Sequence, residues 1–307
     1  MIVARGLSKW YGQVMALNNV SFEIGEGVTG LLGPNGAGKT TFMRLLTGQL
    51  RPSQGSLTLL GEPIWNNPGL MRRVGFCPEE DAFYDDLSGL EFVTALARLS
   101  GLTRAEATAR ALAVLEQVGM SEHMHRELRG YSRGMRQRTK LAQALAHDPD
   151  VLVLDEPLTG TDPVGRRELR MLIASLAEAG KHVIISSHVL HEVEALTRTF
   201  TLIHRGRIVA SGDVHEIRQL MDEHPHQIVI RCDRPRDLAQ ALIALDHVSS
   251  TEIPTETEAL RVETRAPAEF FDAFPGVVLE TGVVVEEFYS EDDDLNAVFR
   301  YLVKGPA

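Results

Sequence analysis

Short apolar runs separated by glycines and polar pairs fill the first part of the chain and predict β-strands. The breaks between them fall at Gly12, at Asn18 with Asn19, and at residues 25–27. Later runs such as residues 151–154, VLVL, carry no charge, which is typical of strands buried on both faces of a parallel sheet. The predicted strands are residues 2–7, 14–17, 20–24, 28–32, 56–60, 74–76, 151–154, 183–186, 200–204 and 208–211.

The pattern changes to helical spacing between about residues 82 and 147. The stretches SGLEFVTALARLSGL and TRAEATARALAVLEQVGM place apolar residues three and four positions apart. Ser88 and Thr103 are N-cap candidates, and Glu106 completes a capping box with Thr103. Strands on both sides of these helices predict an α/β domain with a helical insertion.

A second, smaller α+β domain is expected over residues 221–307, after a polar linker near residue 220. Its pattern has the βαββαβ order of a ferredoxin-like fold. The predicted elements are strand 227–231, helix 235–245, strand 248–253, strand 259–264, helix 267–273, strand 277–286 and a last helix at 292–303.

The charge of the chain is acidic and unevenly distributed. The 307 residues contain 42 Asp plus Glu and 31 Lys plus Arg. Residues 229–307 hold 16 acidic and 7 basic residues, whereas residues 1–228 hold 26 and 24. A nucleic-acid-binding protein usually has a basic stripe, and no such run is visible. The charge pattern therefore argues against nucleic acid as a partner.

Cysteines, histidines and apolar runs give no sign of a disulfide framework, a zinc site or a membrane span. Cys77 and Cys232 lie far apart and are expected to be reduced thiols. The histidines at 123–125 and 224–226 lack partners at metal-ligand spacing, so we interpret them as surface residues. No run approaches the roughly 20 apolar residues of a membrane helix, and the N-terminus lacks a signal pattern. We expect a soluble, cytosolic protein whose membrane role, if any, needs a partner.

A phosphate-binding loop follows the strand at residues 28–32. GPNGAGKT, residues 33–40, fits G-x-x-x-x-G-K-[ST] and opens a helix, which is the context that makes this motif specific. Its backbone N–H groups and the helix N-terminus can bind phosphates. Lys39 is expected at the β- and γ-phosphates and Thr40 at Mg²⁺. A glycine-rich helix cap is the alternative. The nucleotide-binding residues predicted here are Gly33, Asn35, Gly36, Ala37, Gly38, Lys39, Thr40 and Thr41.

Two acids follow the apolar run VLVL. Asp155 and Glu156 come at the carboxyl end of the strand, where ligands bind in open α/β sheets. Asp155 can hold Mg²⁺, directly or through water, and Glu156 can polarise an attacking water molecule. A helix start is the alternative, but Pro157 and Gly160 indicate a loop.

The basic string YSRGMRQR, residues 131–138, lies between these two motifs and gives them a shared context. The order of the phosphate loop, YSRGM, VLVLDEP and SSH (186–188) resembles the ATP-binding subunit of ABC transporters over about residues 1–220. The resemblance implies a P-loop NTPase cassette, an α/β fold with a mixed or parallel core sheet, an antiparallel β subdomain at the N-terminus and an inserted helical subdomain.

In that family, the signature loop of one subunit covers the phosphate bound to a second subunit. The resemblance implies that Ser132 and the N–H of Gly134 contact the γ-phosphate held by a partner. Ser132 is also an N-cap candidate for the helix that follows. Arg136 and Lys140 on that helix are either solvated or paired with acids. The family's signature commonly reads L-S-G-G-Q, and this chain keeps only the serine and the second glycine unchanged.

Three further residues are assigned from the resemblance. Tyr11 matches the aromatic residue that stacks on adenine, with a plain edge tyrosine as the alternative. His188 matches the histidine that bonds the γ-phosphate and orients water, and a purely structural histidine is its alternative. Asp162 matches the loop that crosses the dimer interface, and it also resembles the N-cap of the helix that Pro163 begins.

Glu79 departs from the family pattern, which usually has Gln at this position to sense Mg²⁺ and the attacking water. Glutamate keeps an oxygen ligand for Mg²⁺ but adds a charge and loses the amide donor. The same substitution occurs in the antibiotic- and multidrug-efflux branch, as do a basic third signature residue and an acidic C-terminal extension. The resemblance therefore implies export.

The resemblance implies an ATP hydrolase with Mg²⁺ that works as a homodimer or with a paralogous subunit. Glu156, His188 and Lys39 would be catalytic, and Thr40, Asp155 and Glu79 would hold the metal. A separate transmembrane permease would place the protein on the inner face of the cell membrane. The alternatives are a soluble ABC-type ATPase acting on nucleic acid or in translation, and a regulatory module that binds ATP without hydrolysing it.

Overall fold

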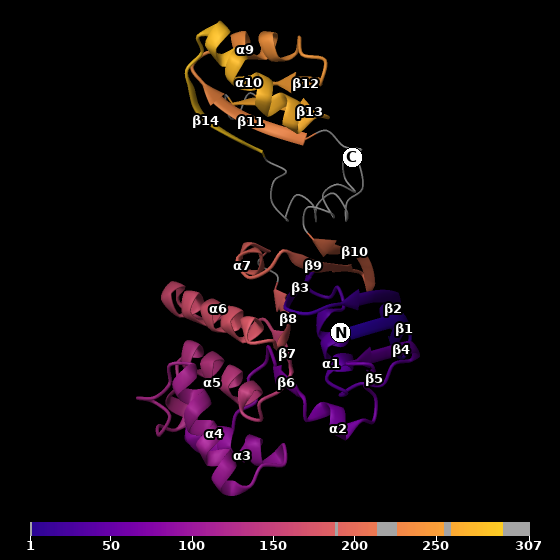
Figure 1. Cartoon of the computed structure of the whole chain (residues 1–307), viewed down its shortest axis with the longest axis vertical. Helices are drawn as coiled ribbons and strands as arrows, with labels where there is room; N and C mark the ends of the chain where they lie inside the picture. The colour runs from indigo at the N-terminus through magenta and orange to yellow at the C-terminus, as the bar shows by residue number, and fades with distance from the viewer. Residues whose placement is uncertain (1, 188–189, 214–225, 255–258, 291–307) are drawn as a thin grey trace. The chain divides into compact units, whose positions relative to one another are not determined.

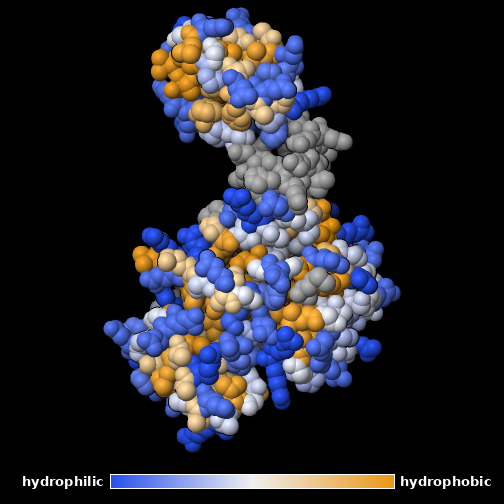
Figure 2. Space-filling view, in the orientation of Figure 1, coloured by the Kyte–Doolittle hydropathy of each residue, from blue (hydrophilic) through white to orange (hydrophobic). Residues whose placement is uncertain are grey.

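The chain forms two compact units, residues 1–212 and 213–307, and each is described by itself (Figure 1). The computed structural model describes residues 2–187, 190–213, 226–254 and 259–290. Within these ranges no helix is both long and apolar enough to cross a bilayer. On the face shown in Figure 2, apolar residues lie in separate patches among hydrophilic ones.

The first unit begins with a four-stranded sheet in the order β2-β1-β4-β5. Strand β1 pairs with both β2 and β4 in antiparallel register. Its strands are β1 (Ile2–Tyr11), β2 (Val14–Ile24), β4 (Gln54–Leu59) and β5 (Glu62–Pro63). The break expected at Asn18 and Asn19 is wrong, because β2 continues through it. Asn19 takes a left-handed φ of +50°, which asparagine tolerates better than most residues, and the pairing register shifts nearby.

A six-stranded sheet in the order β10-β9-β3-β8-β7-β6 forms the centre of the first unit. The pairs β9–β3, β3–β8, β8–β7 and β7–β6 are parallel. Strand β7 is buried along its whole length, as the uncharged run at residues 151–154 predicts. The strands are β3 (Val28–Leu32), β6 (Val74–Cys77), β7 (Val151–Asp155), β8 (His182–Ser187), β9 (Thr199–His204) and β10 (Arg207–Asp213).

Helices cover this sheet. Helix α1 (Lys39–Leu46) contacts β7 of the central sheet and β2 and β4 of the antiparallel sheet, so it joins the two. Helix α5 (Arg133–Leu145) packs on β6 and β7, and α6 (Pro163–Glu178) packs on β8. Figure 1 shows α5 and α6 on the side of the sheet away from α1. The short helices α2 (Pro68–Met71) and α7 (Leu190–Glu194) also lie outside the insertion.

The helical insertion lies between β6 and β7. It contains α3 (Gly89–Leu99), α4 (Arg104–Gln117), the 3₁₀ turn Leu128–Gly130 and α5 (Arg133–Leu145). The predicted N-caps are confirmed: Ser88 caps α3, and Thr103 caps α4 in a capping box with Glu106. Glu91 closes a second box with Ser88, which holds the entry of α3 in the same way.

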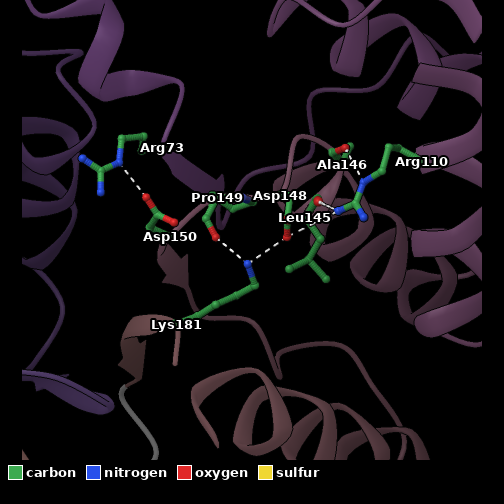
Figure 3. Close-up of polar contacts among 8 residues, drawn as sticks. All are labelled: Arg73, Arg110, Leu145, Ala146, Asp148, Pro149, Asp150 and Lys181. Carbon is green, nitrogen blue, oxygen red and sulfur yellow. Dashed lines mark hydrogen bonds and ion pairs between the residues drawn. The ribbon is translucent and has the colours of Figure 1, made fainter. Parts of the chain in front are cut away.

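A group of ion pairs fixes the turn from α5 into β7 (Figure 3). Lys181, just before β8, pairs with Asp148 at 2.9 Å, and Arg110 of α4 approaches the same carboxylate at 3.6 Å. The hydrogen bond from Lys181 lowers the pKa of Asp148. Arg73 reaches Asp150 at 2.6 Å. Exposed pairs of this kind contribute little singly, but together they fix the strand that ends in Asp155.

The second unit has the element order β11-α9-β12-β13-α10-β14. Its antiparallel sheet is ordered β12-β13-β11-β14. Ile228, Ile230, Leu238 and Phe270 are fully buried in its core. The elements are β11 (His226–Cys232), α9 (Pro235–Leu242), β12 (Val248–Glu252), β13 (Leu260–Thr264), α10 (Pro267–Thr281) and β14 (Val285–Ser290).

One element boundary in this unit was predicted wrongly. A strand was expected over 277–286, but α10 continues to Thr281 and contains Pro275, and β14 begins only at Val285. The β-branched pair Val277 and Val278 suggested a strand, yet both pack against the core from the helix. The predicted last helix, 292–303, lies outside the described residues.

Candidate functional site

The loop between β3 and α1 is built around glycines that no other residue could replace. A Cβ on Gly33 would lie 2.2 Å from the carbonyl oxygen of Ile203. Gly38 has a φ of +114°, and its Cβ would lie 2.8 Å from the carbonyl oxygen of Ala16. Both positions require glycine, because the backbone approaches other backbone more closely than a side chain allows. The loop is therefore held open as a concave backbone surface.

This loop forms one wall of a cavity of about 300 Å³. The other walls come from the end of β7 and from the segment that follows β6. The described residues that line it are Ala16, Pro34, Asn35, Gly36, Gly38, Lys39, Thr40, Thr41, Glu79, Asp155 and Glu156. Residues predicted from three separate motifs thus lie in one cavity. Ala16 and Pro34 were not predicted.

Lys39 is the basic residue of this cavity. Its side chain is buried, and its Nζ donates hydrogen bonds to the carbonyl oxygens of Gly33 at 2.6 Å and Pro34 at 3.3 Å. Burial lowers the pKa of Lys39, and the charges of Glu156, Asp155 and Glu79 partly oppose that shift. These contacts point the ammonium group back along the phosphate-binding loop.

Asp155 and Glu156 are held by a hydroxyl on the neighbouring strand. Ser186 pairs with Asp155 in the parallel register of β7 and β8. The Ser186 hydroxyl donates to Asp155 Oδ1 and accepts the backbone N–H of Glu156 at 3.0 Å. Thr159 Oγ1 donates to Glu156 Oε2 at 3.3 Å. No role was predicted for Ser186 or Thr159, because strand register decides which side chains meet.

The backbone of Glu156 is strained. Its φ is +50°, in the left-handed region that costs a non-glycine residue about 1–2 kcal/mol. The bond from its N–H to Ser186 holds this conformation, and Glu156 is only 6% exposed. Strain of this kind persists only where the surroundings impose it, and such positions cluster at functional sites.

The residues that line the cavity suit a divalent cation that is bound together with a phosphate group. Three carboxylates and the hydroxyl of Thr40 line it opposite a single lysine. Among the described residues, no three His, Cys, Asp or Glu side chains converge into a metal cage. Mg²⁺ is usually bound through one or two carboxylates together with substrate phosphates. The residues therefore fit Mg²⁺ that arrives with a phosphate ligand.

Ser132 and Gly134 do not line this cavity. Ser132 is exposed and caps α5, accepting the N–H of Met135 at 3.2 Å, as predicted for an N-cap. Gly134 lies in the first turn of α5, and a Cβ there would meet no atom closer than 3.9 Å. The serine at the N-terminus of α5 is thus exposed on the surface of the chain.

The remaining predicted residues are not among those that line the cavity, or lie outside the described ranges. Tyr11 ends β1, is 43% exposed and has Lys9 Nζ 5.6 Å from its ring centre. Asp162 caps α6 through the N–H of Gly165 at 3.2 Å, with Pro163 at the first helical position, as predicted. Ala37 is buried, and its carbonyl accepts the N–H of Gly206. His188 lies outside the described residues.

Arg136 and Lys140 of α5 are paired with acids and are not simply solvated. Arg136 reaches Asp85 at 2.9 Å. Lys140 is 3% exposed and reaches Asp81 at 3.1 Å. Both side chains bind acids of the same chain, so neither is free to bind an external anion.

Comparison with known proteins identifies relatives that are named as ATP-binding proteins. The family model described as "ABC transporter" matches residues 17–159. An uncharacterized ABC transporter ATP-binding protein of Synechocystis is 39% identical over 240 residues, which cover 77% of this chain and 67% of that protein. The daunorubicin resistance ATP-binding protein DrrA3 of Streptomyces coeruleorubidus is 31% identical over 98% of this chain and 95% of its own length.

A solved structure has a similar fold. It is a dimeric ATP-binding cassette in a post-hydrolysis state, bound to ADP and Pi, and it matches with a TM-score of 0.65. The match covers 70% of this chain and 99% of that chain, at 21% identity. At this identity the likeness concerns the fold alone.

Proposed function

The chain belongs to the ATP-binding proteins of ABC transporters, a family of ATP hydrolases, and we propose that it drives export through a separate membrane subunit. The observation that carries the ATP-hydrolysing part of this proposal is the cavity in which the phosphate-binding loop, Asp155 and Glu156 meet. Nucleotide sites of this class act by positioning and electrostatics more than by covalent chemistry.

Each charged residue of the cavity has a role in this proposal. Lys39 binds the negative phosphate oxygens, and the N–H groups of the loop and of α1 add partial positive charge. Thr40, Asp155 and Glu79 would hold Mg²⁺, which when bound neutralises charge on the phosphate oxygens. Glu156 accepts a hydrogen bond from the attacking water and orients it. Its strained, buried backbone fixes the carboxylate for that task.

We infer that two chains are needed to complete a site. The cavity of one chain lacks Ser132 and Gly134 among its lining residues, and Ser132 is exposed at the start of α5. A helix N-terminus with a serine cap suits an anion that is held by another molecule. The dimeric state of the solved ATP-binding cassette supports this arrangement.

Export is supported by relatives and by the sequence. The relative that spans nearly the whole chain is named for daunorubicin resistance. Glu79 in place of glutamine, Arg133 in the signature and the acidic residues 229–307 are the features that resemble the efflux branch. A membrane subunit would hold the protein at the inner face of the cell membrane.

We further propose that the second unit is a ferredoxin-like domain. Its order β11-α9-β12-β13-α10-β14 and its antiparallel sheet β12-β13-β11-β14 support that assignment. Its boundary with the ATP-binding domain is proposed near residue 220, in the polar linker.

Glu156→Gln tests the proposed function. The amide keeps the size of the side chain but is a far weaker base, so ATP hydrolysis should fall by about 100-fold or more. Binding of a fluorescent ATP analogue should be retained, and light scattering should detect a dimer with ATP. Glu178→Gln, at the exposed C-terminal end of α6, is the matched control and should hydrolyse ATP normally.

Two results would contradict this assignment. Turnover at the wild-type rate in Glu156→Gln would remove Glu156 from the reaction. A wild-type rate per chain that does not change with protein concentration, in a protein that stays monomeric with ATP, would contradict the shared site.

A further inference from the structure

Lys140 has a second contact that links helix α5 to the cavity. Its Nζ donates to the backbone carbonyl oxygen of Glu79 at 2.6 Å, in addition to the ion pair with Asp81. Glu79 lines the cavity, whereas Lys140 lies in the middle of α5. One buried ammonium group therefore joins α5 to a residue of the nucleotide site in the same chain.

Two other cations hold the rest of this segment in the same way. Arg136 of α5 pairs with Asp85 and lies 5.3 Å from the centre of the Phe83 ring. Arg129, in the 3₁₀ turn before α5, pairs with Asp86 at 2.6 Å. The segment between β6 and α3 is thus bound at several points along its length to α5 and the turn that precedes it.

Lys140 is the strongest of these links because it is buried. Its side chain is 4% exposed, compared with 20% for Arg136 and 59% for Arg129. A buried ammonium group cannot leave its partners without remaining desolvated and unpaired, which is costly. Exposed pairs exchange with water at little cost. The contact to residues 79 and 81 is therefore the one that should keep its geometry.

We propose that Lys140 is a positioning residue that sets where Glu79 lies in the ATP cavity and fastens residues 79–81 to helix α5. The inference deepens the proposed function, since it concerns the same cavity. It makes the place of Glu79 depend on α5, whose N-terminus is at Ser132, about 12 Å along the helix at 1.5 Å per residue. A displacement of α5 is thereby passed to the carboxylate in the chain's own site.

Proteolysis of the nucleotide-free protein tests this contact without relying on activity. Glutamyl endopeptidase cuts after glutamate, and Glu79 and Glu80 are adjacent and exposed. Cleavage needs local release of the chain, so Lys140→Met should speed the cuts after 79 and 80 about fivefold or more. Cleavage after Glu178, in α6, should stay unchanged. Mass spectrometry identifies the fragments.

Arg138→Met is the matched control. Arg138 lies on the same helix, is partly buried and pairs with Glu168 at 2.7 Å, but it holds no part of residues 79–81. It should leave the cuts after 79 and 80 unchanged. Unchanged cleavage in Lys140→Met, or an equal rise after Glu178, would overturn the proposal. If Lys140→Met does not fold, Asp81→Asn replaces it, and no rise at all in that variant would overturn it too.

Kinetics supply the second arm. Lys140→Met should lower kcat about tenfold and raise the Mg²⁺ concentration for half-maximal rate, because Glu79 is misplaced. Its KM for ATP should stay within about threefold, since the phosphate loop is untouched. Lys140→Arg, which keeps a cation, should recover part of kcat. A loss confined to KM would overturn the proposal. If the wild type hydrolyses no ATP, the proposed function fails, while the proteolysis still decides whether Lys140 holds the segment.

Discussion

Ser186→Ala is the substitution whose effect can be worked out most fully from the structure. The Ser186 hydroxyl is fully buried, donates to the carboxylate of Asp155 and accepts the N–H of Glu156. Alanine removes both bonds and adds no atom in their place. The change therefore acts on the two acids of the cavity from the neighbouring strand, without touching the cavity itself.

The expected loss of stability follows from those two bonds. A hydrogen bond to a charged group contributes about 1.5–3 kcal/mol, and a buried donor that loses its acceptor costs about 1–3 kcal/mol. We expect the free energy of unfolding of the first unit to fall by roughly 3 kcal/mol. For a unit of this size that corresponds to a melting temperature lower by about 6–12 °C.

Catalysis should be impaired even at temperatures where the variant is fully folded. Glu156 holds a left-handed φ that its bond to Ser186 supports, so we expect its carboxylate to move when that bond is lost. A displacement of about 1 Å can reduce the rate about 100-fold. We expect kcat to fall at least about tenfold at a temperature where the variant is folded.

Calorimetry and steady-state ATPase measurements check this prediction. The control is Ser175→Ala, which removes an exposed hydroxyl bonded to the carbonyl of Leu172 within α6. It should change the unfolding free energy by less than about 0.5 kcal/mol. A Ser186→Ala protein that melts with the wild type and keeps its kcat would refute the reasoning, because the bridge would then hold neither acid.

Two further predictions concern groups outside the cavity. Burial raises the pKa of Cys77 to about 12. Iodoacetamide at pH 8 should therefore alkylate half-buried Cys232 and leave Cys77 unmodified until the protein unfolds. Peptide mass spectrometry checks this, and alkylation of Cys77 in the folded protein would contradict it. Burial also lowers the pKa of His147. Protons then favour the unfolded chain, so stability should drop as pH falls below about 6.5. His147→Gln, which can still donate to the Val74 carbonyl, should flatten urea-derived stability between pH 7.5 and 5.5, and an identical slope would count against this cause.

The sequence predicted the elements whose signal is local. The phosphate loop follows a strand and opens a helix at Lys39, and Ser88, Thr103 and Ser132 cap helices as expected. In each case the deciding atoms lie within a few residues of one another. Helix caps and turn glycines are accordingly the most predictable parts of this fold.

Pairings between distant segments could not be predicted. The link from Ser186 to Asp155 depends on the register of β7 against β8, and the link from Lys140 to Glu79 depends on how α5 lies on the segment after β6. Nothing in the local sequence selects these partners. The continuation of α10 past Pro275 was also missed for a non-local reason. Packing of Val277 and Val278 against the core outweighs the strand preference of these two valines.

Gly134 has a consequence for how substitutions in this chain would be classified. A Cβ at Gly134 would meet no atom closer than 3.9 Å, which is an ordinary van der Waals contact, and alanine is a better helix former than glycine. A stability score computed on one chain would rank Gly134→Ala as harmless or improved, and Gly33→Ala as severe. With the shared site proposed above, that ranking is misleading at Gly134, because any harm arises only when a second molecule meets the first. Variants at such a position need to be judged on the assembled pair.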